Sequence, residues 1–131
     1  MDINTHTQRL LQNIKVDCIV PIPLSRMRML QRGFNQAHII ATSVGKALGK
    51  PVITNILNRK TGRVQANLKR NQRLTKQRGT FMIRRAHLIR GKHLLIVDDI
   101  YTTGSTVNEC ARILKKHGAR AVNVFTLART I

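Results

Sequence analysis

The chain has 131 residues, 42% of them hydrophobic, which is enough for one hydrophobic core and too few for two. No apolar stretch approaches the ~20 residues of a membrane span, and the first residues lack the basic and apolar segments of a signal peptide, so we expect a single soluble domain in the cytoplasm. The two cysteines, Cys18 and Cys110, lack CxxC spacing, which argues against a disulfide framework and against a zinc ribbon.

The charge of the chain is strongly unbalanced. Its 24 Lys and Arg residues face five acids, which gives a formal net charge of +19, and no acid lies between Asp17 and Asp98. Self-repulsion on this scale opposes folding, so the positive field favours a polyanionic partner, either nucleic acid or a phosphorylated small molecule. A basic surface that serves solubility alone is the alternative interpretation.

The first half of the chain alternates helix and strand patterns. A short amphipathic helix is expected over Thr5–Ile14, and the compact apolar run Cys18–Ile22, which ends among prolines, predicts a buried strand. Apolar residues then recur at helical spacing between a capping Asn35 and a terminating Gly49. A second strand is expected over Val52–Leu57.

The second half begins with Arg59–Gly79, a segment of 21 residues without a clear period, which predicts a functional flap or a disordered loop. Thr80–Ile83 is a short strand candidate, and His93–Val97 is a continuous apolar strand of the kind that a parallel sheet buries on both faces. A helix over Thr106–His117 and a last strand over Ala121–Ala128 follow. Strands that alternate with helices predict an α/β fold with a mainly parallel central sheet.

The most informative segment follows the His93–Val97 strand. Asp98 and Asp99 come directly after it, and a hydroxyl-rich turn with Gly104 leads into the next helix. In open α/β sheets, ligands bind beyond the carboxyl ends of strands and beside helix N-termini. Backbone N–H groups, hydroxyls and the helix dipole would converge there on a position that a phosphate fits. The hydroxyl side chains are those of Thr102, Thr103, Ser105 and Thr106.

The two adjacent carboxylates predict the rest of the ligand. Asp98 and Asp99 would repel a phosphate, but they can accept hydrogen bonds from the two vicinal hydroxyls of a ribose 5-phosphate. An N-capped turn with two solvated aspartates is the alternative, although a cap needs one polar residue and this turn carries several. A P-loop and a dinucleotide fingerprint are excluded because GxxxxGK[ST] and GxGxxG are missing. The five histidines are scattered without metal-ligand spacing.

These residues resemble a known family. Leu94–Thr106 resembles the phosphoribosyl pyrophosphate (PRPP) motif of type I phosphoribosyltransferases, and the remainder resembles the ComF family of competence-type proteins. The matching motifs are VPIP at Val20–Pro23, RGFNQA at Arg32–Ala37, Gln65 and Leu68 with Arg73, GTF at Gly79–Phe81, and TLAR at Thr126–Arg129. The resemblance implies a type I phosphoribosyltransferase fold, with a parallel sheet flanked by helices and a mobile flap.

The resemblance also implies roles for individual residues. Asp98 and Asp99 would bind the ribose 2- and 3-hydroxyls, and Thr102, Thr103, Gly104, Ser105 and Thr106 would hold the 5-phosphate. Pro23–Gly33 would be the pyrophosphate loop, with Arg26, Arg28 and Arg32 as contacts because guanidinium groups match phosphate oxygens. Gln65 and Arg73 would act in the flap. Mg²⁺ would be carried mostly by the pyrophosphate, with Asp98 and Asp99 as its protein oxygens and no site made by protein alone.

The chain departs from the family pattern in two regions. ComF-type proteins often begin with a four-cysteine zinc module, and we expect the present chain to be a phosphoribosyltransferase-type domain over residues 1–131 without it. In the flap, Arg63 and Val64 stand where the family has a proline pair, and Lys76 stands where it has an asparagine. These changes bear on whether the flap supports catalysis.

Three functions fit this resemblance. The first is PRPP and Mg²⁺ binding by a protein of natural transformation, with single-stranded DNA and an ATP-driven competence translocase as partners. The second is an active phosphoribosyltransferase that moves ribose 5-phosphate from PRPP to an unidentified acceptor. The third is a nucleotide-responsive regulator whose active site has lost its activity. Aromatic residues make up 3% of the chain, too few for a base-stacking platform, so DNA binding would rest on phosphate contacts.

Overall fold

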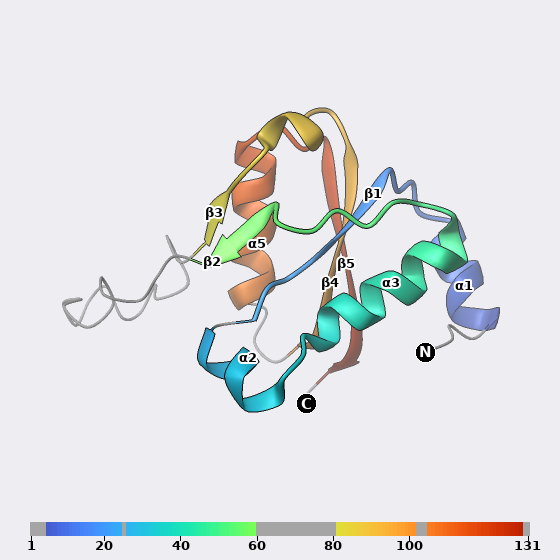
Figure 1. Ribbon diagram of the computed structural model, residues 1–131. Coiled ribbons are helices and arrows are strands. Elements are labelled where there is room, and N and C mark those ends of the chain that lie inside the picture. Colours follow the sequence, from blue (N-terminus) through green and yellow to red (C-terminus); the bar gives the residue numbers. More distant parts are fainter. Residues whose placement is uncertain (1–4, 25, 60–80, 102–104, 130–131) are drawn as a thin grey trace.

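The computed structural model describes residues 5–24, 26–59, 81–101 and 105–129, and its centre is a parallel sheet (Figure 1). The sheet contains β1 (Cys18–Pro21), β4 (His93–Tyr101) and β5 (Ala121–Arg129) in the order β1-β4-β5. Both pairings are parallel, with Cys18 opposite Leu94 and His93 opposite Ala121. The expected α/β fold with a parallel central sheet is therefore confirmed.

One face of the sheet is covered by α1 (Thr5–Gln12) and α3 (Gln36–Leu48). The burial of α3 follows its sequence period, because its apolar residues recur at helical spacing. Asn35 caps α3 by accepting a hydrogen bond from the Ala37 backbone N–H at 3.0 Å, and Gly49 ends it with φ of 66°. This half of the core contains Leu11, Val16, Ile19, Ile40, Ala41, Val44, Leu95 and Val97.

The opposite face is covered by α5 (Ser105–Lys116) and by a small antiparallel ladder of β2 (Leu57–Arg59) and β3 (Phe81–Ile83). A 3₁₀ turn, η2 (Ala86–Leu88), leads from this ladder toward β4. Leu94 and Ile96 of β4 point into this half of the core, whereas Leu95 and Val97 point into the other. The helices therefore enclose β4 on both faces, as a continuous apolar strand requires.

The expected strand over Val52–Leu57 is wrong in its extent. Val52 makes one parallel bridge to Ile19, and the Ile53 backbone N–H donates to the Ile19 carbonyl at 2.9 Å. Asn55 then adopts φ of 63°, a left-handed conformation that turns the chain away from the sheet. The chain pairs again only as β2, with β3 as its partner.

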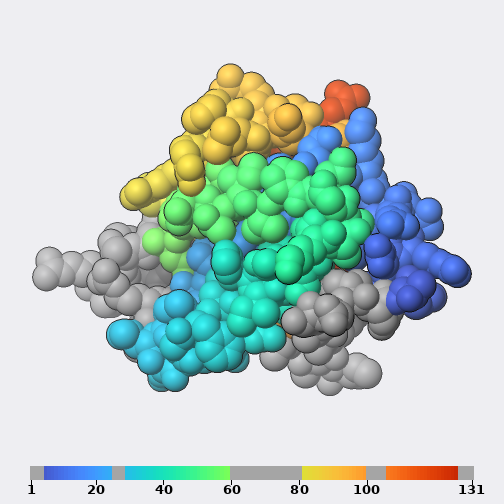
Figure 2. All heavy atoms as spheres, turned by 45° about the vertical axis from the view of Figure 1, so that its right-hand side comes forward, coloured from blue at the N-terminus to red at the C-terminus, as the bar shows by residue number. Residues whose placement is uncertain are grey.

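A second difference concerns Pro23–Gly33, which was expected to be a loop. The structure forms a short helix there, α2 (Arg26–Arg32), which lies along the chain between β1 and α3 (Figure 1). Figure 2 shows the surface from α2 through α3 to β2 as a continuous band from cyan to green. Within the described ranges, none of the helices combines the length and the apolar character needed to cross a membrane.

The approach of α3 to the segment that follows it depends on Gly45. A Cβ atom built on Gly45 would lie 2.8 Å from Val52 Cγ2 and 3.0 Å from the Lys50 carbonyl oxygen. We therefore expect Gly45→Ala to lower the free energy of unfolding by about 1–3 kcal/mol through overpacking, although alanine in a helix otherwise gains about 1 kcal/mol over glycine. Urea denaturation measures this change.

Lys46→Ala is the matched control, because Lys46 lies next in the same helix and its side chain is exposed. Its free energy of unfolding should stay within about 0.5 kcal/mol of the wild-type value. A Gly45→Ala protein as stable as this control would contradict the close packing between α3 and Val52.

Candidate functional site

The acid pair lies on the last part of β4. The sequence placed Asp98 and Asp99 after the end of a strand at Val97, but β4 continues through both acids to Tyr101. The continuation follows from β5, which runs beside β4 and places Thr126 opposite Asp98. Both acids lie at the carboxyl end of the central parallel strand, beyond the end of β1 and before α5. Ligands of open α/β sheets bind at this edge.

The carboxyl group of Asp98 is partly withdrawn from water. Burial raises the pKa of Asp98 from its ordinary 3.8 to about 6, and the neighbouring Asp99 carboxylate adds to the rise. The Asp99 backbone N–H donates to Asp98 Oδ1 at 2.9 Å, and this hydrogen bond, together with the positive charge of Arg59, opposes the rise. Asp98 is thus ionised at neutral pH, and the partial burial of its charge lowers the free energy of unfolding.

Asp98 lies near the thiol of Cys110 and the positive charge of Arg59. Cys110 of α5 is buried there, and this burial raises the pKa of its thiol to about 12, so the sulfur stays protonated and is not a nucleophile. Arg59 of β2 donates from Nε to the Pro23 carbonyl at 2.8 Å. Its guanidinium also lies over the Phe81 ring, 4.6 Å from the ring centroid. Arg59 therefore joins the β2–β3 ladder to the segment after β1.

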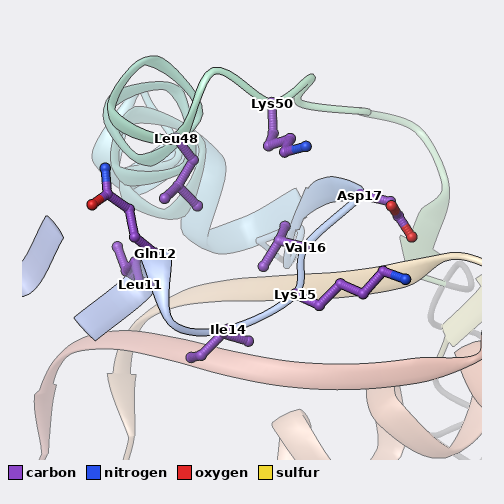
Figure 3. Close-up of a pocket in the computed structure, with 8 residues that line it drawn as sticks. All are labelled: Leu11, Gln12, Ile14, Lys15, Val16, Asp17, Leu48 and Lys50. Atoms are coloured by element: carbon purple, nitrogen blue, oxygen red, sulfur yellow. The ribbon is translucent and has the colours of Figure 1, made fainter. Parts of the chain in front are cut away.

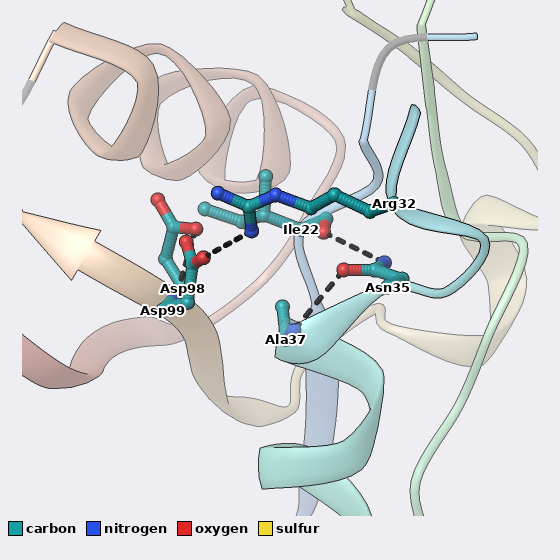
Figure 4. A network of polar contacts seen from close by, with 6 residues as sticks. All are labelled: Ile22, Arg32, Asn35, Ala37, Asp98 and Asp99. Atoms are coloured by element: carbon teal, nitrogen blue, oxygen red, sulfur yellow. Dashed lines mark hydrogen bonds and ion pairs between the residues drawn. The ribbon is translucent and has the colours of Figure 1, made fainter. Parts of the chain in front are cut away.

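Asp99 is paired with Arg32, the last residue of α2. Arg32 Nη1 lies 3.0 Å from Asp99 Oδ2, and the side chains are 35% and 19% exposed respectively (Figure 4). Of the three arginines that the sequence assigned to pyrophosphate, Arg32 is thus brought to the acid pair. Arg26 and Arg28 lie on the same helix, and their side chains are not among those described.

The residues after Arg32 fix its backbone. Gly33 has φ of 77°, a conformation that favours glycine, and its N–H donates to the Met29 carbonyl at 2.7 Å. Asn35 then donates from Nδ2 to the Ile22 carbonyl at 3.2 Å while it caps α3 (Figure 4). The sequence RGFN thus encodes a helix end, a left-handed turn and a cap that is tied to the end of β1.

The other predicted ligand residues are placed as follows. Ser105 begins α5, and Thr106 follows it in the first turn with a partly buried side chain. A phosphate that binds between β4 and α5 would meet this helix terminus. The remaining predicted site residues, which lie outside the described ranges, are Gln65, Arg73, Thr102, Thr103 and Gly104.

The described residues do not form a metal site by themselves. No three His, Cys, Asp or Glu side chains gather within the part of the chain that the structure describes. The acid pair offers carboxylate oxygens, which Mg²⁺ prefers, but too few to enclose the ion. These residues fit a Mg²⁺ ion whose other ligands come from phosphate oxygens and water.

A hollow lies at the opposite end of the sheet from the acid pair (Figure 3). Its lining residues are Leu11, Gln12, Ile14, Lys15, Val16, Asp17, Leu48 and Lys50. Asp17 places this hollow at the amino ends of β1 and β4, because its carboxylate accepts a hydrogen bond from the His93 backbone N–H at 2.7 Å. The hollow is therefore remote from the acid pair, and it does not contribute to the site.

Two residues of the site were not identified from the sequence. Arg59 was treated as the edge of a loop, and Asn35 as a helix cap within the RGFNQA motif, without a role in the site. The RGFN motif could have indicated a role for Asn35 beyond capping, because a helix cap does not require the preceding Arg, Gly and Phe. For Arg59 the sequence held no signal, because its contacts to Pro23 and Phe81 depend on how β2 and β3 pair.

Comparison with known proteins connects this site to a family. A family model described as phosphoribosyl transferase domain matches residues 2–130. Competence protein ComFC from Bacillus subtilis is 35% identical over 113 residues, which cover 86% of this chain and 44% of that protein. DNA utilization protein YhgH from Escherichia coli is 35% identical over 115 residues, covering 88% of this chain and 50% of that protein. The chain therefore spans about half the length of the curated relatives it matches.

A solved structure supports the same fold. Purine phosphoribosyltransferase from Pyrococcus horikoshii superposes with a TM-score of 0.62 at 21% sequence identity, covering 93% of this chain and 66% of that one. At this identity the likeness concerns the fold alone. Together with the relatives above, it confirms the resemblance that the sequence motifs indicated.

The raised pKa of Asp98 predicts a pH-dependent effect of Asp98→Asn on stability. The carboxyl group is protonated in the folded and the unfolded protein below about pH 4 and ionised in both above about pH 6, so the cost of burying its charge grows between these values. Allowing for solvent screening of a partly exposed group, we expect Asp98→Asn to raise the free energy of unfolding by about 1–2 kcal/mol at pH 7.5. The gain should shrink toward pH 4.5.

Urea denaturation of both proteins without ligand, at pH 7.5 and at pH 4.5, measures the gain. An equal difference at the two pH values would show that the ionised form of Asp98 is not the cause.

Proposed function

Because the chain belongs to the phosphoribosyl transferase domain family, we propose that it binds PRPP together with Mg²⁺ and serves the handling of incoming DNA in natural transformation. One observation carries the ligand assignment: a partly buried acid pair lies near the carboxyl end of the central parallel strand and is faced by Arg32. Carboxylates accept hydrogen bonds from hydroxyls, and guanidinium donates them to phosphates. PRPP offers both kinds of group on one ribose ring.

The ribose and its 5-phosphate occupy the β4–α5 side of the site. Asp98 and Asp99 accept hydrogen bonds from the 2- and 3-hydroxyls, and residues 102–106 hold the 5-phosphate at the start of α5. Partial burial supports this role for Asp98, because an ionised carboxylate held out of water gains most from hydroxyl donors. Binding of the ribose thus relieves a free-energy cost that the empty site carries.

The pyrophosphate lies on the side of α2. Arg32 reaches the acid pair from the end of this helix, and Arg26 and Arg28 add positive charge to the same segment. Mg²⁺, when bound, neutralises the phosphate charge, with the oxygens of Asp98 and Asp99 as its protein ligands. Gln65 and Arg73 belong to the flap that closes over the ligand.

The role in DNA handling is supported by charge and by the relatives. The formal net charge of +19 creates a positive field that attracts nucleic acid. Neutralisation of the phosphates by Lys and Arg supplies most of the non-specific affinity of a protein for nucleic acid. Two relatives bear the names Competence protein ComFC and DNA utilization protein YhgH. We propose single-stranded DNA as a partner of the basic surface in the cytoplasm, together with an ATP-driven DNA translocase.

An alternative function is catalytic transfer. The family membership favours it, because a site that holds PRPP with its C1 accessible can support displacement of the pyrophosphate by an acceptor. In that reaction the bond between C1 and the pyrophosphate oxygen breaks, and pyrophosphate leaves with the bonding electron pair. Release of pyrophosphate that depends on a second substrate distinguishes this function from binding alone.

Thermal unfolding with PRPP and Mg²⁺ tests the proposed ligand. A ligand at 100 times its dissociation constant adds about 2.7 kcal/mol to the free energy of unfolding, which raises the melting temperature of a domain this size by on the order of 10 °C. Ribose 5-phosphate and pyrophosphate should each give a smaller rise.

The double variant Asp98→Asn, Asp99→Asn is the control for this experiment. It should fold without ligand and lose the rise that PRPP produces. An equal rise in this variant would mean that PRPP binds elsewhere, and the absence of any rise in the wild-type protein would refute PRPP as the ligand.

The salt dependence of single-stranded DNA binding tests the second partner. Neutralisation of roughly five phosphates predicts a slope of about −3 to −4 when the logarithm of the association constant is plotted against that of the salt concentration. Fluorescence anisotropy with a labelled oligonucleotide measures it. Oligonucleotides of different sequence should bind with similar affinity, and an affinity that barely changes from low to moderate salt would rule out phosphate contacts as the basis of binding.

A further inference from the structure

The amino end of the central sheet carries a row of exposed cations. Lys92 directly precedes β4, Arg120 directly precedes β5, and the Arg120 backbone N–H donates to the Lys92 carbonyl at 2.8 Å. Because β4 and β5 are parallel neighbours, the backbones of the two residues lie about 5 Å apart. Arg90 lies beside them, since a Cβ atom built on Gly118 would lie 3.2 Å from Arg90 Cγ.

The row continues toward β1. The pKa of Asp17 is lowered chiefly by the hydrogen bond from the His93 backbone N–H. The charges of Lys15 and Lys92 lower this pKa further, so both lysines lie near the Asp17 carboxylate. Lys50 lines the same hollow as Lys15 and Asp17. Five cations from separate segments thus form the cationic row: Lys15, Lys50, Arg90, Lys92 and Arg120.

The contacts within the folded domain do not account for these charges. All five side chains are exposed, and no salt bridge of the described residues involves the cationic row. Cations in the last turn of a helix complement its dipole, as Lys115 and Lys116 do in α5. The members of the row lie outside the helices, so this explanation does not apply to them. A bound polyanion would remove their mutual repulsion.

The hollow shown in Figure 3 lies at one end of the row, because Lys15 and Lys50 line it. Its volume is about 290 Å³, close to the ~300 Å³ of the smallest pockets that hold small molecules. In Figure 3 the side chains of Lys15, Asp17 and Lys50 lie on one side of the hollow, and those of Leu11 and Leu48 lie on the other. The hollow therefore suits a group that has apolar faces and is attached to an anion.

We propose that the amino end of the sheet is a second ligand site, in which the cationic row binds the phosphates of a single-stranded nucleic acid and the hollow receives one of its bases. An unpaired base has apolar faces and is joined through its sugar to two phosphates, so it matches the hollow and the row together. A base in a duplex is paired and stacked, and its entry would cost the energy of opening the duplex. The inference rests on the proposed DNA partner, and it adds the location and a basis for strand selectivity.

This second site is separate from the acid pair. From His93, beside the cationic row, to Asp99, β4 advances six residues, or roughly 20 Å at ~3.3 Å per residue. Charges that far apart are largely screened at physiological ionic strength, where the Debye length is ~8 Å. PRPP and nucleic acid can therefore bind at the same time, at opposite ends of one strand.

The experiment measures the binding of a fluorescently labelled oligothymidylate by anisotropy over a range of salt concentrations. We expect the double variant Lys92→Gln, Arg120→Gln to bind about tenfold more weakly at low salt. The magnitude of its salt slope should fall by about 1.4, since each lost phosphate contact removes ~0.7 from the slope for a single strand. The exchange Lys92→Arg, Arg120→Lys keeps both charges and should retain the wild-type slope.

The double variant Lys46→Gln, Arg84→Gln is the matched control. It removes the same two charges from exposed positions outside the row, in α3 and directly after β3. Its slope should change by less than about 0.5, because no direct phosphate contact is lost. Melting temperatures without ligand should stay within about 3 °C of the wild-type value for all these variants, since the substituted side chains are exposed.

Two further ligands test the hollow. A base-free deoxyribose phosphate oligomer of the same length should bind the wild-type protein about threefold more weakly, because it buries no base. The duplex of oligothymidylate with oligoadenylate should also bind more weakly than the single strand. Electrostatics alone would favour the duplex, whose charge density is higher, so a preference for the single strand requires contact with an unpaired base.

The outcomes separate this site from the proposed function. Equal losses in the row variant and in the control would mean that net charge alone attracts DNA, which overturns the site and leaves the DNA partner intact. Equal binding of the base-free oligomer would overturn the role of the hollow. Displacement of the oligonucleotide by PRPP with Mg²⁺ at constant ionic strength would place the DNA at the acid pair, which equally overturns the proposal. A wild-type protein that does not bind oligothymidylate would instead refute the DNA partner itself.

Discussion

The burial of β4 on both faces is the constraint on which the rest of the structure depends. Leu94 and Ile96 pack under α5, and Leu95 and Val97 pack under α3, so the strand lies within both halves of the core. A strand enclosed in this way cannot shift its register by one residue without moving polar groups into the core. The position of the acids that follow is therefore set by the core and not by the loop around them. Asp98 and Asp99 are held where the strand leaves the apolar interior.

The chain has few acidic residues, and each of those that the structure describes makes a specific polar contact. Asp17 holds the start of β4 through the His93 backbone N–H, a hydrogen bond that lowers the pKa of Asp17. Glu109, which is buried in α5, pairs with Arg112 through two contacts, of 2.7 Å and 2.9 Å. Asp99 pairs with Arg32, and the partly buried Asp98 accepts a hydrogen bond from the Asp99 backbone N–H. In a chain so dominated by positive charge, carboxylates persist at positions where a hydrogen bond or a ligand requires them.

Elements with a strong local pattern could be predicted from the sequence, and those fixed by distant contacts could not. The caps Asn35 and Gly49 bound α3 as expected, since both act through their own backbone neighbours. The short helix α2 has no apolar period, and the prolines before it indicated a loop. The extension of β4 to Tyr101 depends on β5, and the turn at Asn55 depends on where β2 finds its partner.

The same distinction holds for the site. The acids were identified from their position after an apolar run, a property of neighbouring residues. The contact between Arg32 and Asp99 spans 67 residues, and the link from Arg59 to Pro23 spans 36, so both depend on the completed fold. Sequence could therefore name the site's residue types, whereas their pairing required the structure.

The β2–β3 ladder affects how the sequences of proteins with this fold can change in length during evolution. Arg59 and Phe81 stand opposite one another in the ladder, so the two ends of the intervening segment lie side by side. When a flexible segment joins two neighbouring points, doubling its length adds only about 0.6 kcal/mol to the entropic cost of closing it. Insertions and deletions between these two positions are thus tolerated by the domain at little expense in stability. Evolution can therefore lengthen, shorten or replace this segment while the sheet and its acid pair stay as they are.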